Sequence, residues 1–359
     1  MEDTWRVLGE VEVGLDPEGV VVGGPLRRAF VACSRSDAVA VVDLDRLEVV
    51  GQVRVGREPI DIVADDPSGR LFVADARSDQ VSVVDAATAE VVATVAVGAY
   101  PAGLGIDPEA RLVYCGDTMG STMTVLDADS LAVVATVPAE LGAGAVAADP
   151  RHARAYCVNF LSASVTVADT TTWEVVDRIA VGEGPCAVAV NPVADEVYVV
   201  GSLASRVTAL DAGTGKQLRE MAVPNAPVGL AVGPAGDRLY VGNRGDGTMS
   251  VLGLDGAEWS RVPVGKGPGG VAVHPDDGRL VLVANAGSGT LSVVEDLTAG
   301  PPAAWPATGA APTLAPTPAH PLVGRTLPPF SLPDLHSRRL RHSHEWAERK
   351  YILEFFASW

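Results

Sequence analysis

One acidic position recurs every 42 residues along most of this chain. It is occupied at Asp43, Asp85, Asp127, Asp169, Asp211, Gly253 and Glu295. Prolines recur at nearly the same interval, at Pro25, Pro67, Pro108, Pro150, Pro192, Pro234 and Pro275. A repeat of roughly 40–45 residues is the length of one blade of a β-propeller. The spacing therefore predicts seven copies of one supersecondary unit.

Residues 56–97 show what one copy contains. Short runs rich in β-branched side chains occupy residues 60–64, 70–74, 81–84 and 91–95. Glycine, proline and aspartate separate the runs, and these residues favour turns. The pattern predicts a four-stranded antiparallel sheet. Such a sheet cannot bury both faces alone, so the copies must pack on one another.

The two ends of the repeat region complement each other. The seventh copy, residues 264–297, supplies only three strands, while residues 4–14 resemble residues 172–182, a fourth strand elsewhere in the chain. We expect the N-terminal strand to complete the last sheet and close the ring, which removes exposed sheet edges. An open β-solenoid, the alternative, would not need a complementary end. The expected fold is all-β, a seven-bladed β-propeller closed by the N-terminal strand.

Four short motifs carry a resemblance to a known family. They are Gly182-Glu183-Gly184-Pro185, Asn191-Pro192, Tyr240-Val241-Gly242-Asn243 and Val84-Asp85. Over residues 5–297 the chain resembles the YVTN family of bacterial β-propellers, with one departure at Ala143, where a proline is usual. The resemblance implies a rigid scaffold for recognition. It implies no reaction, because function on a propeller depends on its loops.

Net charge and hydropathy limit the classes of partner that the chain is expected to bind. The net charge is −18, and the ring carries nearly all of it, because residues 298–359 hold six Lys or Arg against four Asp or Glu. This balance predicts no nucleic-acid partner. No apolar run approaches the length of a membrane span, and no leader precedes Trp5, so we expect no membrane insertion and a cytoplasmic location. An extracytoplasmic location is the alternative if the start codon is misassigned.

Cysteine and histidine usage predicts no metal site and no cofactor. The four cysteines, Cys33, Cys115, Cys157 and Cys186, form no Cys-x-x-Cys pair. Two of them, Cys115 and Cys157, share a repeat position with Val73, which predicts small buried core residues rather than a disulfide. The histidines are too scattered to gather metal ligands.

The repeat ends before the C-terminus. Residues 298–321 hold seven prolines, eight alanines and no Asp, Glu, Lys or Arg. This composition predicts an extended linker that spans up to roughly 70 Å.

Residues 322–359 show a second pattern, given by Pro328-Pro329-Phe330-Ser331-Leu332-Pro333-Asp334-Leu335 and by Phe355-Phe356-Ala357-Ser358-Trp359. This segment resembles the start of a TlpA-type redoxin domain, which has a thioredoxin-like fold. In that family Cys-x-x-Cys follows, and its first thiolate attacks a disulfide. The resemblance implies a truncated thiol-disulfide oxidoreductase, active only if the chain continues past Trp359 into a Cys-x-x-Cys or selenocysteine-x-x-Cys motif. A selenocysteine codon read as a stop, a Cys-to-stop change, a frameshift and a cut fragment are the alternatives for this end.

Most candidate ligand contacts lie in the loops that join the fourth strand of one blade to the next blade and the second strand to the third. These loop residues are Arg35, Arg57, Arg77, Tyr100, Phe160, Arg244 and Lys266, and Asp61, expected on an innermost strand, is the further candidate. Mixed charge with two aromatic rings suits a protein or a small polar ligand, and equally suits an ordinary solvated surface. No catalytic residue is assigned.

Asp61 is unusual in its repeat column. The column is otherwise made of tiny residues, at Gly19, Gly103, Ala145, Ala187, Gly229 and Gly270. A lone carboxylate there would hold a cation or an amine, or would face channel water. One carboxylate is too few for calcium, which needs six to eight oxygens.

Three functions remain open at this stage. The first is a binding scaffold tethered to the oxidoreductase domain, and the second is a stand-alone interaction protein. The third is a lactonase-type propeller enzyme, which would need acid–base groups gathered at one mouth. The ring holds only His152 and His274, both expected on the opposite face.

Overall fold

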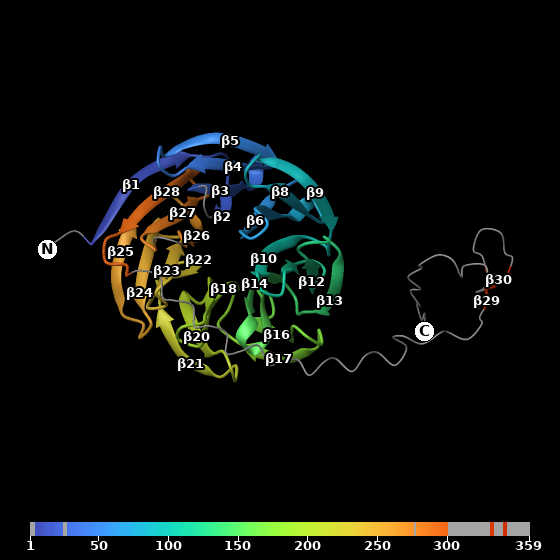
Figure 1. Ribbon diagram of the computed structural model, residues 1–359. Helices are drawn as coiled ribbons and strands as arrows, with labels where there is room; N and C mark the ends of the chain where they lie inside the picture. Colours follow the sequence, from blue (N-terminus) through green and yellow to red (C-terminus); the bar gives the residue numbers. More distant parts are fainter. Residues whose placement is uncertain (1–3, 24–26, 276–277, 301–330, 334–339, 343–359) are drawn as a thin grey trace. The chain divides into compact units, whose positions relative to one another are not determined.

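Seven four-stranded antiparallel sheets form a closed ring (Figure 1). The computed structural model describes residues 4–23, 27–275, 278–300, 331–333 and 340–342. Each sheet is one blade, and in six blades the strands are paired in chain order. The predicted seven-bladed propeller is confirmed.

The first three blades follow the N-terminal strand. Blade 1 consists of β2 (Pro17–Gly23), β3 (Arg28–Cys33), β4 (Ala38–Asp43) and β5 (Glu48–Arg54). Blade 2 consists of β6 (Pro59–Asp65), β7 (Arg70–Asp75), β8 (Gln80–Asp85) and β9 (Glu90–Ala96). Blade 3 consists of β10 (Pro101–Asp107), β11 (Leu112–Asp117), β12 (Thr122–Asp127) and β13 (Val133–Pro138). The four runs predicted within residues 56–97 each lie inside one strand of blade 2.

The next three blades repeat this order. Blade 4 consists of β14 (Ala143–Asp149), β15 (Arg154–Asn159), β16 (Ser164–Asp169) and β17 (Val175–Ala180). Blade 5 consists of β18 (Pro185–Asn191), β19 (Glu196–Gly201), β20 (Arg206–Asp211) and β21 (Gln217–Ala222). Blade 6 consists of β22 (Pro227–Val232), β23 (Arg238–Asn243), β24 (Thr248–Gly253) and β25 (Glu258–Pro263). Single 3₁₀ turns occupy η2 (Ser34–Ser36), η3 (Ala76–Ser78) and η4 (Pro150–His152).

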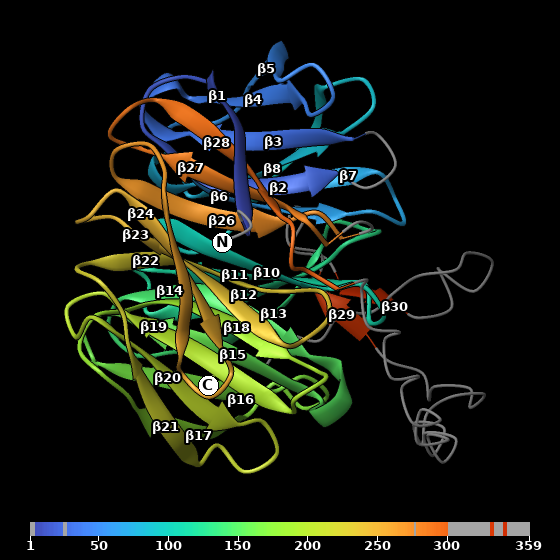
Figure 2. The same cartoon turned by 90° about the vertical axis from the view of Figure 1, so that its left-hand side faces the viewer.

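Blade 7 joins the two ends of the ring. Its strands β26 (Pro268–Val273), β27 (Leu280–Asn285) and β28 (Thr290–Asp296) are completed by β1 (Trp5–Glu12), which pairs antiparallel with β28. Figure 2 shows β1 beside β28. Val11 of β1 is buried in the core between blades 7 and 1, and burying a valine contributes roughly 1.5–3 kcal/mol. The predicted closure by the N-terminal strand is therefore confirmed.

The core consists of seven clusters, one between each pair of neighbouring sheets. Valine, alanine and leucine predominate, but one repeat position also holds a fully buried aromatic ring in six blades. These rings are Phe30, Phe72, Tyr114, Tyr156, Tyr198 and Tyr240. Each packs against the following blade, as Phe30 does against Leu71 and Val73. The few aromatic residues are thus concentrated where one sheet meets the next.

Tiny residues on the first and second strands, such as Gly103 on β10 and Gly116 on β11, permit the close approach of the blades. A Cβ atom on Gly103 would lie 2.4 Å from the Cα of Ala145, and one on Gly116 would lie 1.9 Å from the carbonyl oxygen of Gly144. Because the neighbouring atoms belong to the backbone, a larger side chain would push the blades apart.

A second unit spans residues 308–359. The structure describes one antiparallel pair in it, β29 (Ser331–Pro333) with β30 (Leu340–His342). The predicted linker beyond Gly300 lies outside the described residues, as does the redoxin-like segment at residues 322–359 apart from residues 331–333 and 340–342. No helix in the described part of the chain is long and apolar enough to cross a membrane.

Candidate functional site: the mouth of the central channel

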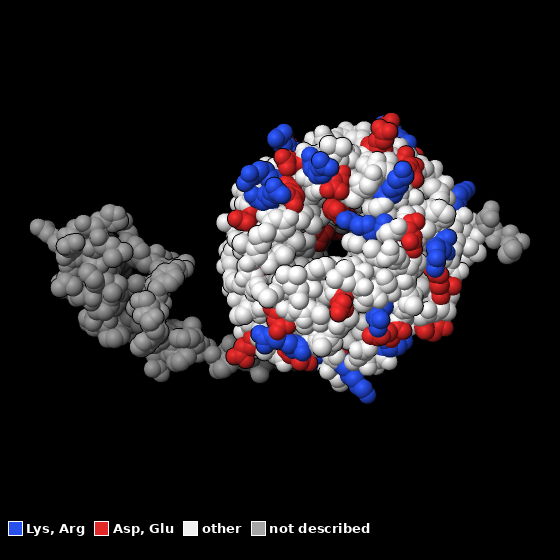
Figure 3. Space-filling view, turned by 180° about the vertical axis from the view of Figure 1, so that it is seen from behind, with Lys and Arg blue, Asp and Glu red and all other residues white. Residues whose placement is uncertain are grey.

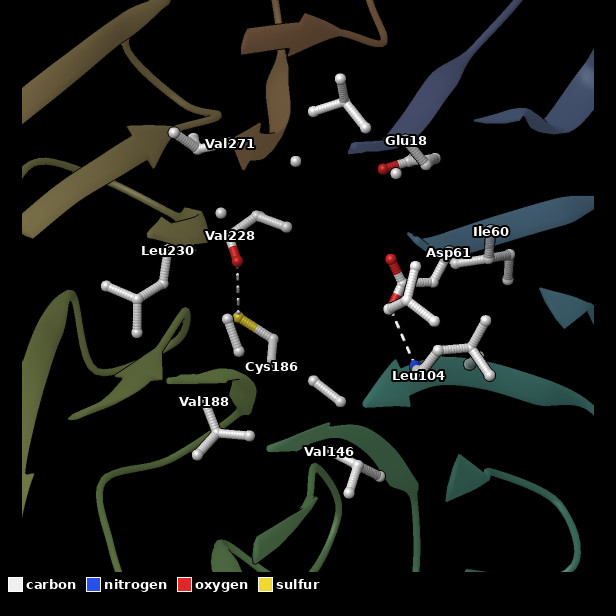
Figure 4. A pocket seen from close by; sticks show the side chains of 18 residues that line it. Glu18, Ile60, Asp61, Leu104, Val146, Cys186, Val188, Val228, Leu230 and Val271 are labelled. Carbon is white, nitrogen blue, oxygen red and sulfur yellow. Dashed lines mark hydrogen bonds between the residues drawn. The ribbon is translucent and has the colours of Figure 1, made fainter. Parts of the chain in front are cut away.

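The innermost strands of all seven blades surround a cavity of about 250 Å³ (Figure 4). Figure 3 shows one face of the ring with its central opening, inside which acidic side chains are visible. Three side chains supply the chemistry of the cavity: Glu18 on β2, Asp61 on β6 and Cys186 on β18. The first two come from adjacent blades, and Cys186 lies across the cavity from them (Figure 4).

A β-bulge at the start of the innermost strands explains why neighbouring positions both reach the cavity. The register shifts between Pro17 and Val20 in blade 1 and between Pro59 and Asp61 in blade 2. A bulge interrupts the alternation of side chains between the two faces of a sheet. As a result Glu18 and Asp61, which occupy successive positions of the repeat, line the same space.

The carboxylate of Asp61 is held by two backbone donors. Its Oδ1 accepts a hydrogen bond from Ile62 N at 2.9 Å, and its Oδ2 accepts one from Leu104 N at 2.8 Å. Burial raises the pKa of Asp61 to about 6, while these two hydrogen bonds act in the opposite direction. The predicted lone carboxylate therefore lines the cavity, with its orientation set by blades 2 and 3.

Glu18 forms an ion pair with Arg244, which comes from blade 6. Burial raises the pKa of Glu18, and the Arg244 guanidinium lowers it. Sequence analysis predicted Arg244 but missed Glu18. The signal was available, because the residues one repeat apart from Glu18 are apolar or tiny, at Ile60, Ala102, Gly144, Cys186, Val228 and Gly269.

Cys186 is a structural thiol. Its Sγ donates to the carbonyl oxygen of Pro227 at 3.5 Å, and burial raises its pKa to about 12. A thiol must ionise to act as a nucleophile, so this cysteine is inert near neutral pH. All four cysteines are free, and Cys115 and Cys157 are fully buried, as predicted.

Three of the predicted loop residues gather around Glu58 on the rim of blades 1 to 3. Tyr100 Oη donates to Glu58 Oε1 at 2.5 Å, and Arg77 Nε pairs with Glu58 Oε2. Arg57 Nη2 donates to the backbone oxygen of Arg77 at 2.8 Å. We call Arg57, Glu58, Arg77 and Tyr100 the charged rim.

Phe160 lies in a different setting, among exposed apolar side chains that sequence analysis did not single out. Four of these side chains are 73% (Met119), 72% (Leu161), 67% (Leu203) and 62% (Leu141) exposed. All four, like Phe160, lie in strand-2-to-3 or strand-4-to-1 loops of blades 3 to 5. We call the loops that carry these five residues the apolar loops.

The remaining predicted residues lie apart from both groups. The backbone N–H of Arg35 donates to Leu15 O, and that of Lys266 donates to Ser288 Oγ. His152 and His274 follow the first strands of blades 4 and 7, at the face opposite the mouth, and His152 Nδ1 lies 2.7 Å from Asp149 Oδ2. Within the described residues no group of three or more His, Cys, Asp or Glu is arranged to hold a metal ion.

Comparison with protein-family models finds no match, and no curated protein matches the sequence. Among solved structures, the ring is similar to a chain of hydrazine synthase from Kuenenia stuttgartiensis, with a TM-score of 0.71. The sequences are 22% identical, and the match covers 78% of this chain and 95% of that chain. This similarity establishes a shared fold alone, and the chain is by its fold a seven-bladed β-propeller.

Proposed function

We propose that the ring is a binding scaffold for a partner protein, which docks on the face formed by the apolar loops and the charged rim. The observation that carries this proposal is the exposure of Met119, Leu141, Leu161 and Leu203 in loops of three neighbouring blades. Large apolar side chains gathered on one face, beside polar ones, are typical of protein interaction sites.

The loops are held in place before any partner binds. Phe160 N donates to Gly142 O at 2.9 Å, and Leu161 N donates to Leu141 O at 3.1 Å. Each strand-2-to-3 loop is in this way tied to the adjoining strand-4-to-1 loop. Preformed loops lose little conformational entropy on binding, which favours affinity.

The charged rim supplies polar contacts beside this apolar surface. Arg57 and Arg77 are exposed. The Arg57 guanidinium is held by a hydrogen bond to the backbone oxygen of Arg77, and the Arg77 guanidinium is held by its ion pair with Glu58. Exposed arginines at an interface margin act mainly on specificity and association rate. The expected partner segment has apolar side chains flanked by acidic ones.

We also propose that the ring belongs with the YVTN-type propellers and that residues 322–359 begin a redoxin domain joined by the linker at residues 298–321. The motifs quoted above support both assignments. Joining a scaffold to an oxidoreductase would raise the effective concentration of the enzyme near the docked partner.

Site-specific photo-crosslinking tests the docking face. A photoreactive amino acid is placed at Leu161 or Leu203 in cells that make the protein, and at Val193 as a control. Val193 is 48% exposed but lies in the strand-1-to-2 loop of blade 5, on the opposite face. We expect the same crosslinked protein from Leu161 and Leu203 and not from Val193. With the photoreactive residue at Leu203, we expect Leu161→Glu to abolish the crosslinked product and Val193→Glu to leave it unchanged. Equal labelling from both faces, or no product at all, would refute the proposal.

The redoxin assignment has a separate test in the coding DNA. We expect the reading frame beyond codon 359 to carry a Cys codon or UGA, then x-x-Cys and the rest of a thioredoxin-like domain. An ordinary stop followed by unrelated sequence would leave a stand-alone interaction protein.

A further inference from the structure

We propose that the cavity at the channel mouth binds a small organic ammonium ion, with its charged group on Asp61 and its hydrocarbon part against the channel wall. This site opens at the same face of the ring as the docking surface, but it is formed by the innermost strands, and its ligand does not depend on a docked partner. Three features of the cavity carry the inference: the placement of charge, the apolar wall and the size.

Among the residues that the structure describes, no cationic side chain pairs with Asp61. Glu18 is paired with Arg244, whereas the hydrogen bonds to Asp61 come from the neutral backbone of Ile62 and Leu104. Each carboxylate oxygen has two lone-pair directions, and each oxygen of Asp61 accepts one of these bonds. An ammonium group would occupy the remaining directions and supply the missing positive charge.

Aliphatic side chains line the cavity next to Asp61, together with polar backbone atoms. Figure 4 shows Leu104, Val146, Val188, Leu230 and Val271 around the cavity, and Val63 lines it as well. An inorganic cation such as calcium needs six to eight oxygen ligands, more than the carboxylates of Glu18 and Asp61 provide. An alkyl chain is stabilised by each CH₂ group that it buries against aliphatic side chains, so the cavity favours an organic cation.

The volume of the cavity and the neighbouring Arg244 limit the size and charge of the ligand further. The cavity of about 250 Å³ lies below the range of pockets for drug-sized molecules, which begins near ~300 Å³. The guanidinium of Arg244 is paired with Glu18, which lines the cavity, and this positive charge disfavours a second cationic group on the ligand. We therefore expect a monoamine to bind better than a diamine of similar length.

Isothermal titration calorimetry on the full chain tests this inference with n-butylammonium chloride at about pH 7.5, where the amine is charged and the carboxylate is ionised. The comparison ligands are 1-butanol, 1,4-diaminobutane and potassium chloride. We expect saturable binding of n-butylammonium and weaker binding of all three others. The absence of saturable binding, or equal binding of 1-butanol or potassium, would overturn the proposal.

Two substitutions at Asp61 separate binding from folding. Asp61→Asn keeps the shape but removes the charge, and Asp61→Ala installs the residue that blades 4 and 5 already carry at this position, in Ala145 and Ala187. Glu183→Gln is the control, because Glu183 is an exposed acid in a loop on the same face. We expect both Asp61 variants to weaken n-butylammonium binding at least about tenfold and the control to leave it unchanged. Wild-type affinity in Asp61→Ala, or an equal loss in Glu183→Gln, would refute the role of Asp61.

Discussion

Replacing Asp117 by asparagine should make the ring more stable, and increasingly so as the pH rises. Asp117 ends β11 and is fully buried, and its Oδ2 accepts hydrogen bonds from Thr122 Oγ1 at 2.8 Å and Thr124 Oγ1 at 2.7 Å. In blade 4 the same repeat position holds Asn159, whose Nδ2 bonds the equivalent hydroxyls of Ser164 and Thr166 at 3.0 and 2.9 Å. The substitution therefore removes a charge and keeps the hydrogen bonds, because a hydroxyl either donates or accepts.

The direction of this pH dependence follows from the pKa of Asp117. Burial raises the pKa of Asp117, with Thr124 and Thr122 acting in the opposite direction. A carboxyl group whose pKa is raised by folding stabilises the fold fully below its unfolded pKa, and this contribution is lost as the pH rises through the folded value. A tenfold difference in proton affinity between the folded and unfolded states corresponds to about 1.4 kcal/mol. We expect Asp117→Asn to be nearly neutral below the unfolded pKa of about 3.9 and to raise the free energy of unfolding at neutral pH, with the difference growing as the pH rises.

Urea unfolding of both proteins, followed by tryptophan fluorescence between about pH 4 and pH 7, measures the difference directly. Asp127→Asn in the same blade is the matched control. Its carboxylate accepts hydrogen bonds from Ser130 N and Asp129 N, which lower its pKa, so its loss should cost more stability at neutral pH than in acid. A difference for Asp117→Asn that is independent of pH, or a loss of stability at neutral pH, would refute the reasoning.

Three further predictions concern packing and buried polar groups. Asp296→Asn should lower the free energy of unfolding by about 2 kcal/mol, because Arg238, itself 7% exposed, loses its charged buried partner at 2.6 Å but keeps Asp237; denaturant unfolding checks this. Gly116→Ala should destabilise the ring by several kcal/mol, because its Cβ atom would meet a backbone oxygen of the next blade. Gly51→Ala is the control: its Cβ atom would have no contact closer than 3.7 Å, so the denaturant midpoint of unfolding should change little. Cys186 should resist iodoacetamide near pH 8 until the chain is unfolded, because its pKa lies at about 12; rapid native labelling would contradict the buried thiol.

Much of the fold was accessible from the sequence because each blade contacts mainly its neighbours. A 42-residue period places equivalent residues on equivalent strands, so Cys115 and Cys157 were predicted as core residues from Val73 alone. Closure was predictable for the same reason, since residues 4–14 match a strand that the seventh copy lacks. The column of aromatic residues is visible in the repeat as well.

The repeat, the number of blades, the closing strand and the unusual carboxylate of Asp61 can be read from the sequence alone. Which side chains meet depends on how the blades pack. The pairing of Glu18 with Arg244 joins residues 226 positions apart, and it arises because curvature brings blades 6 and 1 around one channel. The bulges that turn Glu18 and Asp61 into the same cavity depend on strand pairing, and the shared exposure of Met119, Leu161 and Leu203 depends on the ring presenting three loops on one face. A periodic sequence specifies positions along a strand, whereas distances across the channel follow from how the sheets pack.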